Sequence, residues 1–263
     1  MRGYGLRMAS NQPSVVVTGA AHRLGKAIAV GFAEAGWHVV IHYRRSAEAA
    51  EALAASLPSA ETVCCDLMNG DAAVAMVEEL AERLANWRAL VNCASLFERD
   101  DVTALDPATN ERAMTVNART PARMAQAYLA KAQASGGRRV IQVTDQKLAN
   151  PNPDFFSYTM SKHALASTVP MLAMGAARPE DRVYALAPGA ILASHDQDEA
   201  ETECSHRLNL LGRKTGKKEI ADAALFLAGG SLASGQTLYV DSGQHLLSQP
   251  RDVIYLARET GAR

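Results

Sequence analysis

Short apolar runs alternate with longer segments of helical periodicity along most of this chain. Runs of four to six residues bounded by turn residues predict strands, and they lie at Ser14–Thr18, Trp37–His42, Glu61–Cys65, Arg88–Asn92, Arg139–Thr144, Arg182–Leu186 and Thr237–Val240. Segments with helical spacing of apolar positions predict helices, and they lie at Leu24–Ala35, Ser46–Leu57, Asp71–Asn86, Thr109–Ala134, Phe156–Ala177 and Glu219–Ala228. The predicted order is strand then helix, repeated six times and closed by a last strand.

The predicted strands are apolar along their whole length and do not alternate with polar positions. Strands of this kind are buried on both faces, which is typical of a parallel sheet covered by helices. Right-handed crossovers then give an α/β fold, a Rossmann-type doubly wound parallel sheet of about seven strands with helices on both faces. In such a sheet ligands bind at the carboxyl ends of the strands, so we expect the chemistry in the turns that follow them.

We expect one α/β domain over residues 14–247, a loose leader at 1–13 and a C-terminal extension at 248–263. The leader carries two arginines but no apolar stretch, so it does not read as a secretory signal, and Met8 is an alternative start. The extension contains the apolar run Val253–Leu256. We therefore expect it to dock on something rather than hang free.

Composition narrows the classes of function. Lys and Arg number 27 against 28 Asp and Glu, so no basic excess points to nucleic acid. No apolar run reaches the roughly 18 residues of a membrane span. The cysteines have neither C-x-x-C spacing nor a histidine cluster beside them, so no metal site is expected. They are predicted to be buried thiols of a cytoplasmic protein, and they are Cys64, Cys65, Cys93 and Cys204.

The first predicted strand runs into a glycine-containing turn, from Gly19 to Gly25, after which a helix begins. A dinucleotide needs glycines there because the backbone bends tightly and approaches the pyrophosphate closely. The helix then offers free N–H groups and the positive end of its dipole to the phosphates. The pattern T-G-x-x-x-R-L-G replaces the common G-x-G-x-x-G. It predicts dinucleotide binding, and the alternative is a strand-to-helix turn that binds nothing.

The second predicted strand ends in Arg44, Arg45 and Ser46, where an NAD-binding chain would carry an acid for the ribose 2′-hydroxyl. Guanidinium groups match a 2′-phosphate in charge and in fork geometry. The position therefore predicts NADP(H) as the cofactor. The alternative is that the two arginines are solvated surface charges.

Tyr158 and Lys162 follow the fifth predicted strand and lie four positions apart on one predicted helix, so they share a face. An ammonium group beside a phenol favours the phenolate, so Lys162 is expected to lower the pKa of Tyr158 toward working pH. A Y-x-x-x-K pattern alone is common by chance. Placed after the glycine turn, in this order of elements, it predicts a proton-transferring pair.

Together these features resemble the short-chain dehydrogenase/reductase superfamily over residues 14–246. The motifs that carry the resemblance are Thr18–Gly25, Asp66, Asn92-Cys93-Ala94, Asn117, Tyr158 with Lys162, Pro188-Gly189 and Asp241-Ser242-Gly243. The resemblance implies that Asp66 lies near the adenine, that Asn117 joins the proton relay, and that the Pro188 turn faces the nicotinamide. The expected cofactor-binding residues are Gly19, Arg23, Leu24, Gly25, Arg44, Arg45, Ser46, Asp66, Leu67, Asn92, Ala94, Ser95, Pro188 and Gly189.

Departures from the general family pattern resemble one subgroup, the pteridine reductases and bacterial dihydromonapterin (dihydrofolate) reductases. Arg23 stands where Ala or Gly is usual, Asp145 stands where a catalytic Ser is usual, and Phe97 follows Asn92–Ser95. The resemblance implies that Phe97 stacks on a pterin, a flat ring rich in hydrogen-bonding groups. It implies that Arg23 and Ser95 contact cofactor and substrate, and that Asp145 anchors the substrate or relays protons.

Each of these residues also has a plainer interpretation. Phe97 could be a core aromatic, Asp145 could cap the loop that follows it, and Arg23 could pair with a surface acid. Taken together, the sequence predicts an NADPH-dependent reductase of a dihydropterin-type substrate, with Tyr158 as proton donor and Asn117 as support. The alternatives are a short-chain carbonyl reductase of a sugar, polyol or ketoacyl substrate, and a non-catalytic NADP(H)-binding sensor or scaffold.

The segment Ser194–Leu211 is expected, from the resemblance, to form a lid over the substrate. Its acids and histidines lack a fixed ligand spacing, so a solvated lid helix is predicted rather than a metal site; they are His195, Asp196, Asp198, Glu199, Glu201, Glu203 and His206. The resemblance also implies a homotetramer or homodimer, built on the helices Thr109–Ala134 and Phe156–Ala177.

Overall fold

The computed structural model describes residues 11–194 and 197–261. Its strands form one seven-stranded parallel sheet in the order β3-β2-β1-β4-β5-β6-β7, and they are β1 (Ser14–Val17), β2 (His38–Tyr43), β3 (Ala60–Cys64), β4 (Trp87–Asn92), β5 (Arg139–Val143), β6 (Arg182–Pro188) and β7 (Thr237–Val240). The predicted fold class is confirmed, and every predicted strand is present within one or two residues of its expected bounds. Residues 1–10 of the expected leader and residues 195–196 of the expected lid lie outside the described residues.

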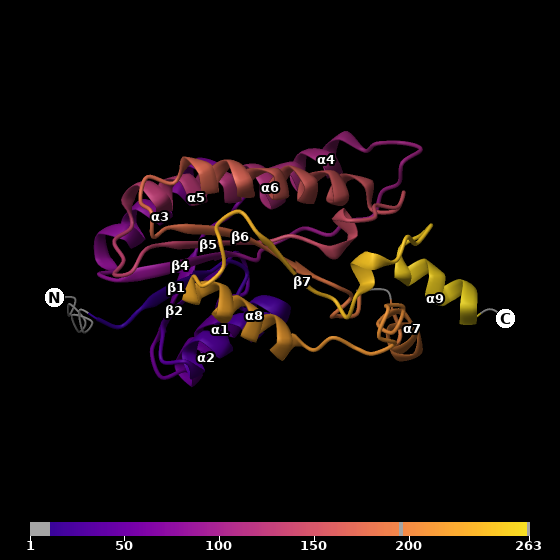
Figure 1. Cartoon of the computed structure of the whole chain (residues 1–263), viewed down its shortest axis with the longest axis horizontal. Helices are drawn as coiled ribbons and strands as arrows, with labels where there is room; N and C mark the ends of the chain where they lie inside the picture. The colour runs from indigo at the N-terminus through magenta and orange to yellow at the C-terminus, as the bar shows by residue number, and fades with distance from the viewer. Residues whose placement is uncertain (1–10, 195–196, 262–263) are drawn as a thin grey trace.

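Helices cover both faces of the sheet (Figure 1). One layer contains α1 (Arg23–Glu34), α2 (Ala47–Ser56) and α8 (Lys217–Gly229). The opposite layer contains α3 (Gly70–Arg83), α4 (Pro107–Met114), α5 (Thr120–Lys131) and α6 (Phe156–Gly175). Two shorter helices, α7 (Glu199–Ser205) and α9 (Val253–Gly261), lie side by side beyond the end of the sheet.

The two helix layers explain why the strands are continuously apolar. In β1, Val15 and Val17 pack into the core on the α1 side, whereas Val16 between them packs into the core on the α3 side. All three side chains are fully buried. Since successive side chains of a strand point to opposite faces, a strand between two helix layers needs an apolar residue at every position.

The sheet order reverses between β1 and β4, which are neighbours although two strands separate them in sequence. The connections after β1 and β4 therefore leave in opposite directions and open a crevice at the carboxyl ends of these strands. The glycine turn follows β1 and the segment from Cys93 to Phe97 follows β4, so both motifs face this crevice.

The predicted helix Thr109–Ala134 is present as one uninterrupted helical segment, but it is not α-helical along its whole length. It consists of α4, a π-helical turn at Thr115–Arg119, and α5. The π turn has a local cause, because Pro121 lacks the N–H that an α-helix would direct to residue 117 and its ring would clash with that carbonyl. The turn also carries Asn117, which is fully buried.

The prediction that all four cysteines are buried is wrong for Cys64. Cys64 is exposed, whereas the adjacent Cys65 is buried. The reason is that Cys64 ends β3, which lies at the edge of the sheet and is only half-buried along its length. Cys93 and Cys204 are half-buried.

Candidate active site

A cavity of about 580 Å³ lies in the crevice at the carboxyl ends of the strands. It is lined by the turns that follow β1, β2, β3, β4, β5 and β6, and by parts of the lid and of the C-terminal extension. Almost all of the residues predicted from the sequence to bind cofactor or substrate line it; the exceptions are Asn92 and Asn117, which lie behind its wall.

The glycine turn is built for close backbone approach. Gly19 has φ +66°, a left-handed conformation that favours glycine. A Cβ on Gly25 would lie 2.4 Å from the carbonyl oxygen of Gly19, so no larger residue fits there. Helix α1 begins next to this turn without a side-chain cap and without acidic residues in its first turn. Its N–H groups are therefore available to a phosphate.

His42 holds this turn in place, a role that sequence reasoning did not assign. Its Nδ1 accepts a hydrogen bond from the Gly19 N–H at 3.1 Å, and its Nε2 donates to the Cys65 carbonyl at 3.1 Å. Burial lowers the pKa of His42 to about 4, so the ring is neutral and has one donor and one acceptor to match these partners. The sequence marked His42 only as the first residue of the strand end His42–Ser46, whose pattern resembles that of the pteridine reductases.

Arg44 and Arg45 line the cavity beyond β2, and both are exposed. Neither guanidinium makes a hydrogen bond or ion pair with another described residue. Ser46 occupies the N-cap of α2, as expected, but its hydroxyl makes no capping hydrogen bond. The end of β2 therefore presents two uncompensated positive charges and a hydroxyl to the cavity.

Tyr158 and Asp145 are hydrogen-bonded inside the cavity. The Tyr158 hydroxyl donates to Oδ2 of Asp145 at 2.6 Å, while Oδ1 of Asp145 accepts from the backbone N–H of Lys147 at 2.8 Å. Asp145 thus caps the short 3₁₀ turn Gln146–Leu148 and also contacts the phenol. Capping and proton relay were alternatives in sequence, and the geometry allows one carboxylate to do both.

Lys162 lies one helical turn beyond Tyr158 on α6, as its spacing predicts. Its Nζ donates to the Val143 carbonyl at 2.7 Å and lies 5.7 Å from the centroid of the Tyr158 ring. Burial lowers the pKa of Lys162 to about 8. This buried ammonium therefore loses its proton near pH 8 and is still mainly charged at neutral pH.

The expected lowering of the Tyr158 pKa is wrong, because burial outweighs the nearby ammonium of Lys162. Burial raises the pKa of Tyr158 well above its usual value, and the carboxylate of Asp145 raises it further. Burial also raises the pKa of Asp145. The two groups therefore retain protons more strongly than they would in water, so Tyr158 is present as a phenol rather than a phenolate.

The two buried asparagines shape the wall of the site from behind. Asn117 accepts from the Leu96 N–H at 2.7 Å and donates to the Leu96 carbonyl at 2.9 Å and to Ser161 at 3.0 Å. Asn92 donates to the Pro121 carbonyl and to Gln142. Asn117 thereby connects the segment that carries Phe97 to the helix that carries Tyr158.

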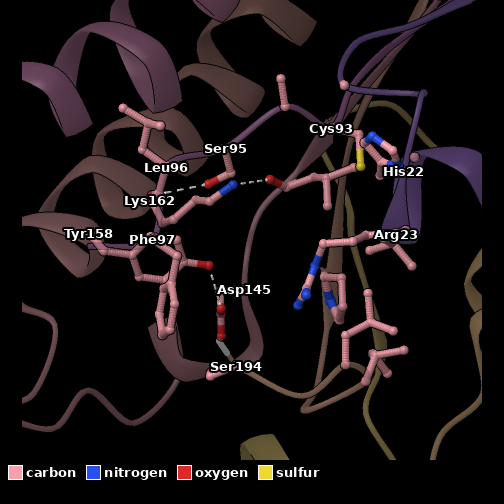
Figure 2. A pocket seen from close by; sticks show the side chains of 18 of the residues that line it. His22, Arg23, Cys93, Ser95, Leu96, Phe97, Asp145, Tyr158, Lys162 and Ser194 are labelled. Atoms are coloured by element: carbon pink, nitrogen blue, oxygen red, sulfur yellow. Dashed lines mark hydrogen bonds between the residues drawn. The ribbon is translucent and has the colours of Figure 1, made fainter. Parts of the chain in front are cut away.

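Phe97 and Arg23 face each other across the cavity. Figure 2 shows Phe97, Tyr158 and Asp145 on one side, with Arg23 and His22 opposite. Phe97 is 38% exposed, and its ring meets Tyr158 edge-on at 4.7 Å between centroids. Arg23 donates to the Ala193 carbonyl at 2.8 Å rather than pairing with a surface acid, and its φ is +53°.

The remaining expected residues lie at the edges of the cavity. Asp66, Leu67, Ser95 and the Pro188-Gly189 turn all line it, and Asp66 accepts from the Met68 N–H. From the lid, the lining residues include Ser194, Gln197, Ser205 and His206. Within the residues that the structure describes, no group of three or more metal-ligating side chains is present, and no helix is long and apolar enough to cross a membrane.

Comparison with known proteins identifies the family. The family model described as enoyl-(acyl carrier protein) reductase matches residues 19–245. The FolM alternative dihydrofolate reductase 1 of Brucella suis, solved in complex with NADP, is 35% identical with a TM-score of 0.84, over 92% of this chain and 98% of that one. The chain therefore belongs to the short-chain dehydrogenase/reductase family of oxidoreductases.

Within that family the similarities point to the pteridine reductase subgroup. Dihydromonapterin reductase of Escherichia coli strain 536 is 26% identical over 91% of this chain and all of its own length. The granaticin polyketide synthase putative ketoacyl reductase 2 of Streptomyces violaceoruber is 29% identical over 91% of this chain and 98% of its own. Arg23, Phe97 and Asp145 are the positions at which the sequence itself favoured the pteridine reductases.

Proposed function

We propose that this protein is an NADPH-dependent reductase of a dihydropterin-type substrate, with Tyr158 as the proton donor. The observation that carries the proposal is the pair formed by Tyr158 and Asp145, hydrogen-bonded at 2.6 Å and lying next to the exposed ring of Phe97. A carboxylate at this position, beside an aromatic face, suits the reduction of a flat heterocycle.

The residues of the cavity fit NADP(H). The turn at Gly19–Gly25 has no room for a Cβ at Gly25, so it keeps the tight backbone bend that a bound pyrophosphate needs. Arg44 and Arg45 have no partner among the described residues, and a 2′-phosphate would supply one. When bound, this cofactor supplies a hydride. The residues proposed to hold it are those that line the same stretch of the cavity, from Gly19 and Arg23 to Asp66, Ser95 and Gly189.

The protein's own part in the reaction is to deliver a proton. Reduction of a C=N bond needs a proton on nitrogen, and the Tyr158 hydroxyl is kept protonated by burial and by Asp145. The buried ammonium of Lys162 stabilises the phenolate left behind. Asp145 then takes up a proton from water and passes it to the Tyr158 phenolate along their hydrogen bond, since its own raised pKa allows it to carry one. Asn117 keeps the Phe97 segment and α6 in register.

The substrate is proposed to lie between Phe97 and Arg23, with its ring on Phe97. An aromatic stack of this kind contributes about 0.5–1.5 kcal/mol beyond the area it buries. Ser95 and Asp145 are the polar groups proposed to contact the edge of the ring. The lid residues Ser194, Gln197, Ser205 and His206 line the far side, which excludes water from the reacting atoms.

Assembly and location extend the proposal. Helix α6 exposes Met171 and, at 81%, Met174, an apolar face that a second copy would cover. We therefore propose a homotetramer or homodimer that uses α5 and α6. The four free cysteines suit a reducing, cytoplasmic location.

The test is NADPH oxidation with a panel of dihydropterins and a panel of ketones, sugars and ketoacyl thioesters. Turnover of a dihydropterin, with competitive inhibition by a diaminopteridine, supports the proposal. Turnover confined to the carbonyl panel identifies a carbonyl reductase instead, and tight NADPH binding without any turnover identifies a sensor or scaffold.

Phe97→Ala sharpens the test of the stacking residue. It is expected to raise KM for the dihydropterin roughly tenfold, without altering the affinity for NADPH. Phe226→Ala is the matched control, because Phe226 is an exposed phenylalanine on α8 outside the cavity. Equal KM values for the two variants would remove Phe97 from the proposed substrate site.

A further inference from the structure

Three aromatic rings form a column that runs from the cavity to the C-terminal helix. Phe97, at the cavity, stacks on Phe155 with 4.1 Å between centroids and 24° between planes. Phe155 in turn lies almost parallel to Tyr255 of α9, with centroids 6.1 Å apart. The proposed stacking ring therefore rests on Phe155, and Phe155 rests on Tyr255. Neither supporting ring has a part in the function proposed above.

The middle ring of the column is held in a strained backbone. Phe155 has φ +55°, a conformation that bulky residues rarely adopt. It is 7% exposed, its N–H donates to the Asp100 carbonyl, and the Lys147 ammonium lies 5.4 Å from its ring. Such a conformation persists only where surrounding contacts enforce it, and it is concentrated at functional sites. Here it lies three residues before Tyr158.

Ion pairs hold the start of α9 beside this ring. The Asp154 carboxylate, 8% exposed as a side chain, accepts from the Arg251 guanidinium and from the Asp252 N–H. The buried Lys147 ammonium then joins the two segments, since it donates to the Asp154 carbonyl at 2.7 Å and to the Asp252 carboxylate at 3.1 Å. Lys147 lies two residues after Asp145, so the C-terminal extension is anchored beside the segment that carries Asp145.

The far end of α9 is tied to the lid. The Arg258 guanidinium pairs with Glu201 of α7 at 3.0 Å, and the two helices lie side by side (Figure 1). Between the two anchors, Val253 and Ile254 line the cavity. Ile254 is buried against Phe155 and Tyr158. The same helix thus walls the cavity with Ile254 and supports the column with Tyr255.

We propose that α9 is part of the substrate site: Tyr255 and Phe155 are positioning residues that fix the Phe97 ring, and Ile254 limits the size of the substituent that a dihydropterin can carry. This inference rests on the proposed function. It assigns no proton transfer to α9, and it adds the C-terminal extension to the machinery that selects the substrate.

The first test compares Tyr255→Ala with Tyr255→Phe, which keeps the ring. For 7,8-dihydropterin, Tyr255→Ala is expected to raise KM about fivefold or more while kcat and the NADPH dissociation constant change less than about twofold. Tyr255→Phe is expected to match the wild type, as is Glu259→Gln at an exposed position of the same helix. An unchanged KM in Tyr255→Ala, or equal losses in Tyr255→Ala and Tyr255→Phe, overturns the role of the ring.

The second test addresses the wall. Ile254→Ala removes three carbon atoms from the cavity lining, so it should raise kcat/KM for 7,8-dihydrofolate relative to 7,8-dihydropterin by about threefold or more. The two substrates share a ring and differ in the size of the substituent. A ratio unchanged from the wild type overturns the role of Ile254.

A ligand-free measurement separates this inference from the proposed function. Amide hydrogen exchange of residues 94–98 should become faster in Tyr255→Ala and stay unchanged in Tyr255→Phe, with the melting temperature of both reported alongside. If the wild type reduces no dihydropterin but the exchange responds in this way, the substrate proposal fails and the positioning role stands. If exchange does not respond, the positioning role fails whatever the substrate.

Discussion

The two ends of the cavity are built in different ways. At the dinucleotide end, a few consecutive residues of the Gly19–Gly25 turn supply the tight bend, the open backbone and the helix N-terminus. At the substrate end, Phe97, Asp145, Tyr158 and Ile254 come from four separate segments that meet only in the folded chain. Backbone geometry forms the turn at the first end, to which Arg44 and Arg45 add charge, whereas converging side chains form the second end. Mutations should therefore divide cleanly between cofactor affinity and substrate chemistry.

The largest effect is expected from Tyr158→Phe, which leaves the ring and removes the hydroxyl. It should lower kcat by about 10²–10⁴ because no group replaces the proton donor, while NADPH affinity stays nearly intact. Steady-state kinetics and a fluorescence titration of NADPH measure the two quantities. Near-full turnover would transfer the donor role to Asp145 or to water. A parallel loss of NADPH affinity would show that the two ends are not separable.

A reversal of charge at the dinucleotide end of the cavity should change the affinity for the cofactor alone. Wild-type protein is expected to bind NADPH at least about tenfold more tightly than NADH, and Arg45→Asp should erase or reverse that preference. Arg178→Ala, an exposed arginine outside the cavity, is the matched control. Titration with NADPH and with NADH measures this preference. Equal affinities in the wild type would contradict the assignment of Arg44 and Arg45 to a 2′-phosphate.

The pH dependence of the rate probes the substrate end. Lys162 has a pKa lowered by burial to about 8, so it is charged below that pH and neutral above it. Since the ammonium stabilises the phenolate of Tyr158, kcat/KM for the reduction should fall as pH rises through about 8. NADPH binding should stay constant over the same range if Arg44 and Arg45 dominate it. A rate that rises between pH 8 and 9 would contradict the role given to Lys162.

The smallest effect concerns Arg23, the residue shared by both ends. Its φ of +53° is costly for any side chain, so Arg23→Gly should raise the free energy of unfolding by about 0.5–1 kcal/mol. The same change removes a charge facing Phe97, so KM for substrate should increase a few-fold. Chemical denaturation and steady-state kinetics test the two halves. A variant that is more stable and equally active would mean that Arg23 is not retained for binding.

Sequence alone was sufficient for the sheet and for much of the dinucleotide end. The continuous apolar runs gave seven strands, and both faces of β1 are buried as those runs require. The glycine turn and the pair Tyr158 and Lys162 were also readable, since each depends on spacing within one element. Local patterns of this kind survive folding because neighbouring residues constrain each other directly.

Sequence was insufficient where distant segments meet. It did not show that burial and Asp145 raise the pKa of Tyr158, because desolvation is a property of the packed site. The sequence marked Val253–Leu256 as an apolar run, but it did not show which residues they contact. The sequence analysis also did not predict the π-helical turn at Thr115–Arg119, although Pro121 was a local signal for it.

What the amino-acid sequence determined by itself is the order of elements and the place of the glycine turn, and it supplied the residues proposed to react. What only the tertiary structure decided is their environment: which carboxylate meets the Tyr158 hydroxyl, which ring supports Phe97, and that Ile254 of the C-terminal helix closes the wall. The physical reason is the distance along the chain over which each kind of interaction acts. Periodicity and turn chemistry act over a few residues, whereas burial, charge coupling and ring stacking depend on contacts between residues as far apart in sequence as Phe155 and Tyr255.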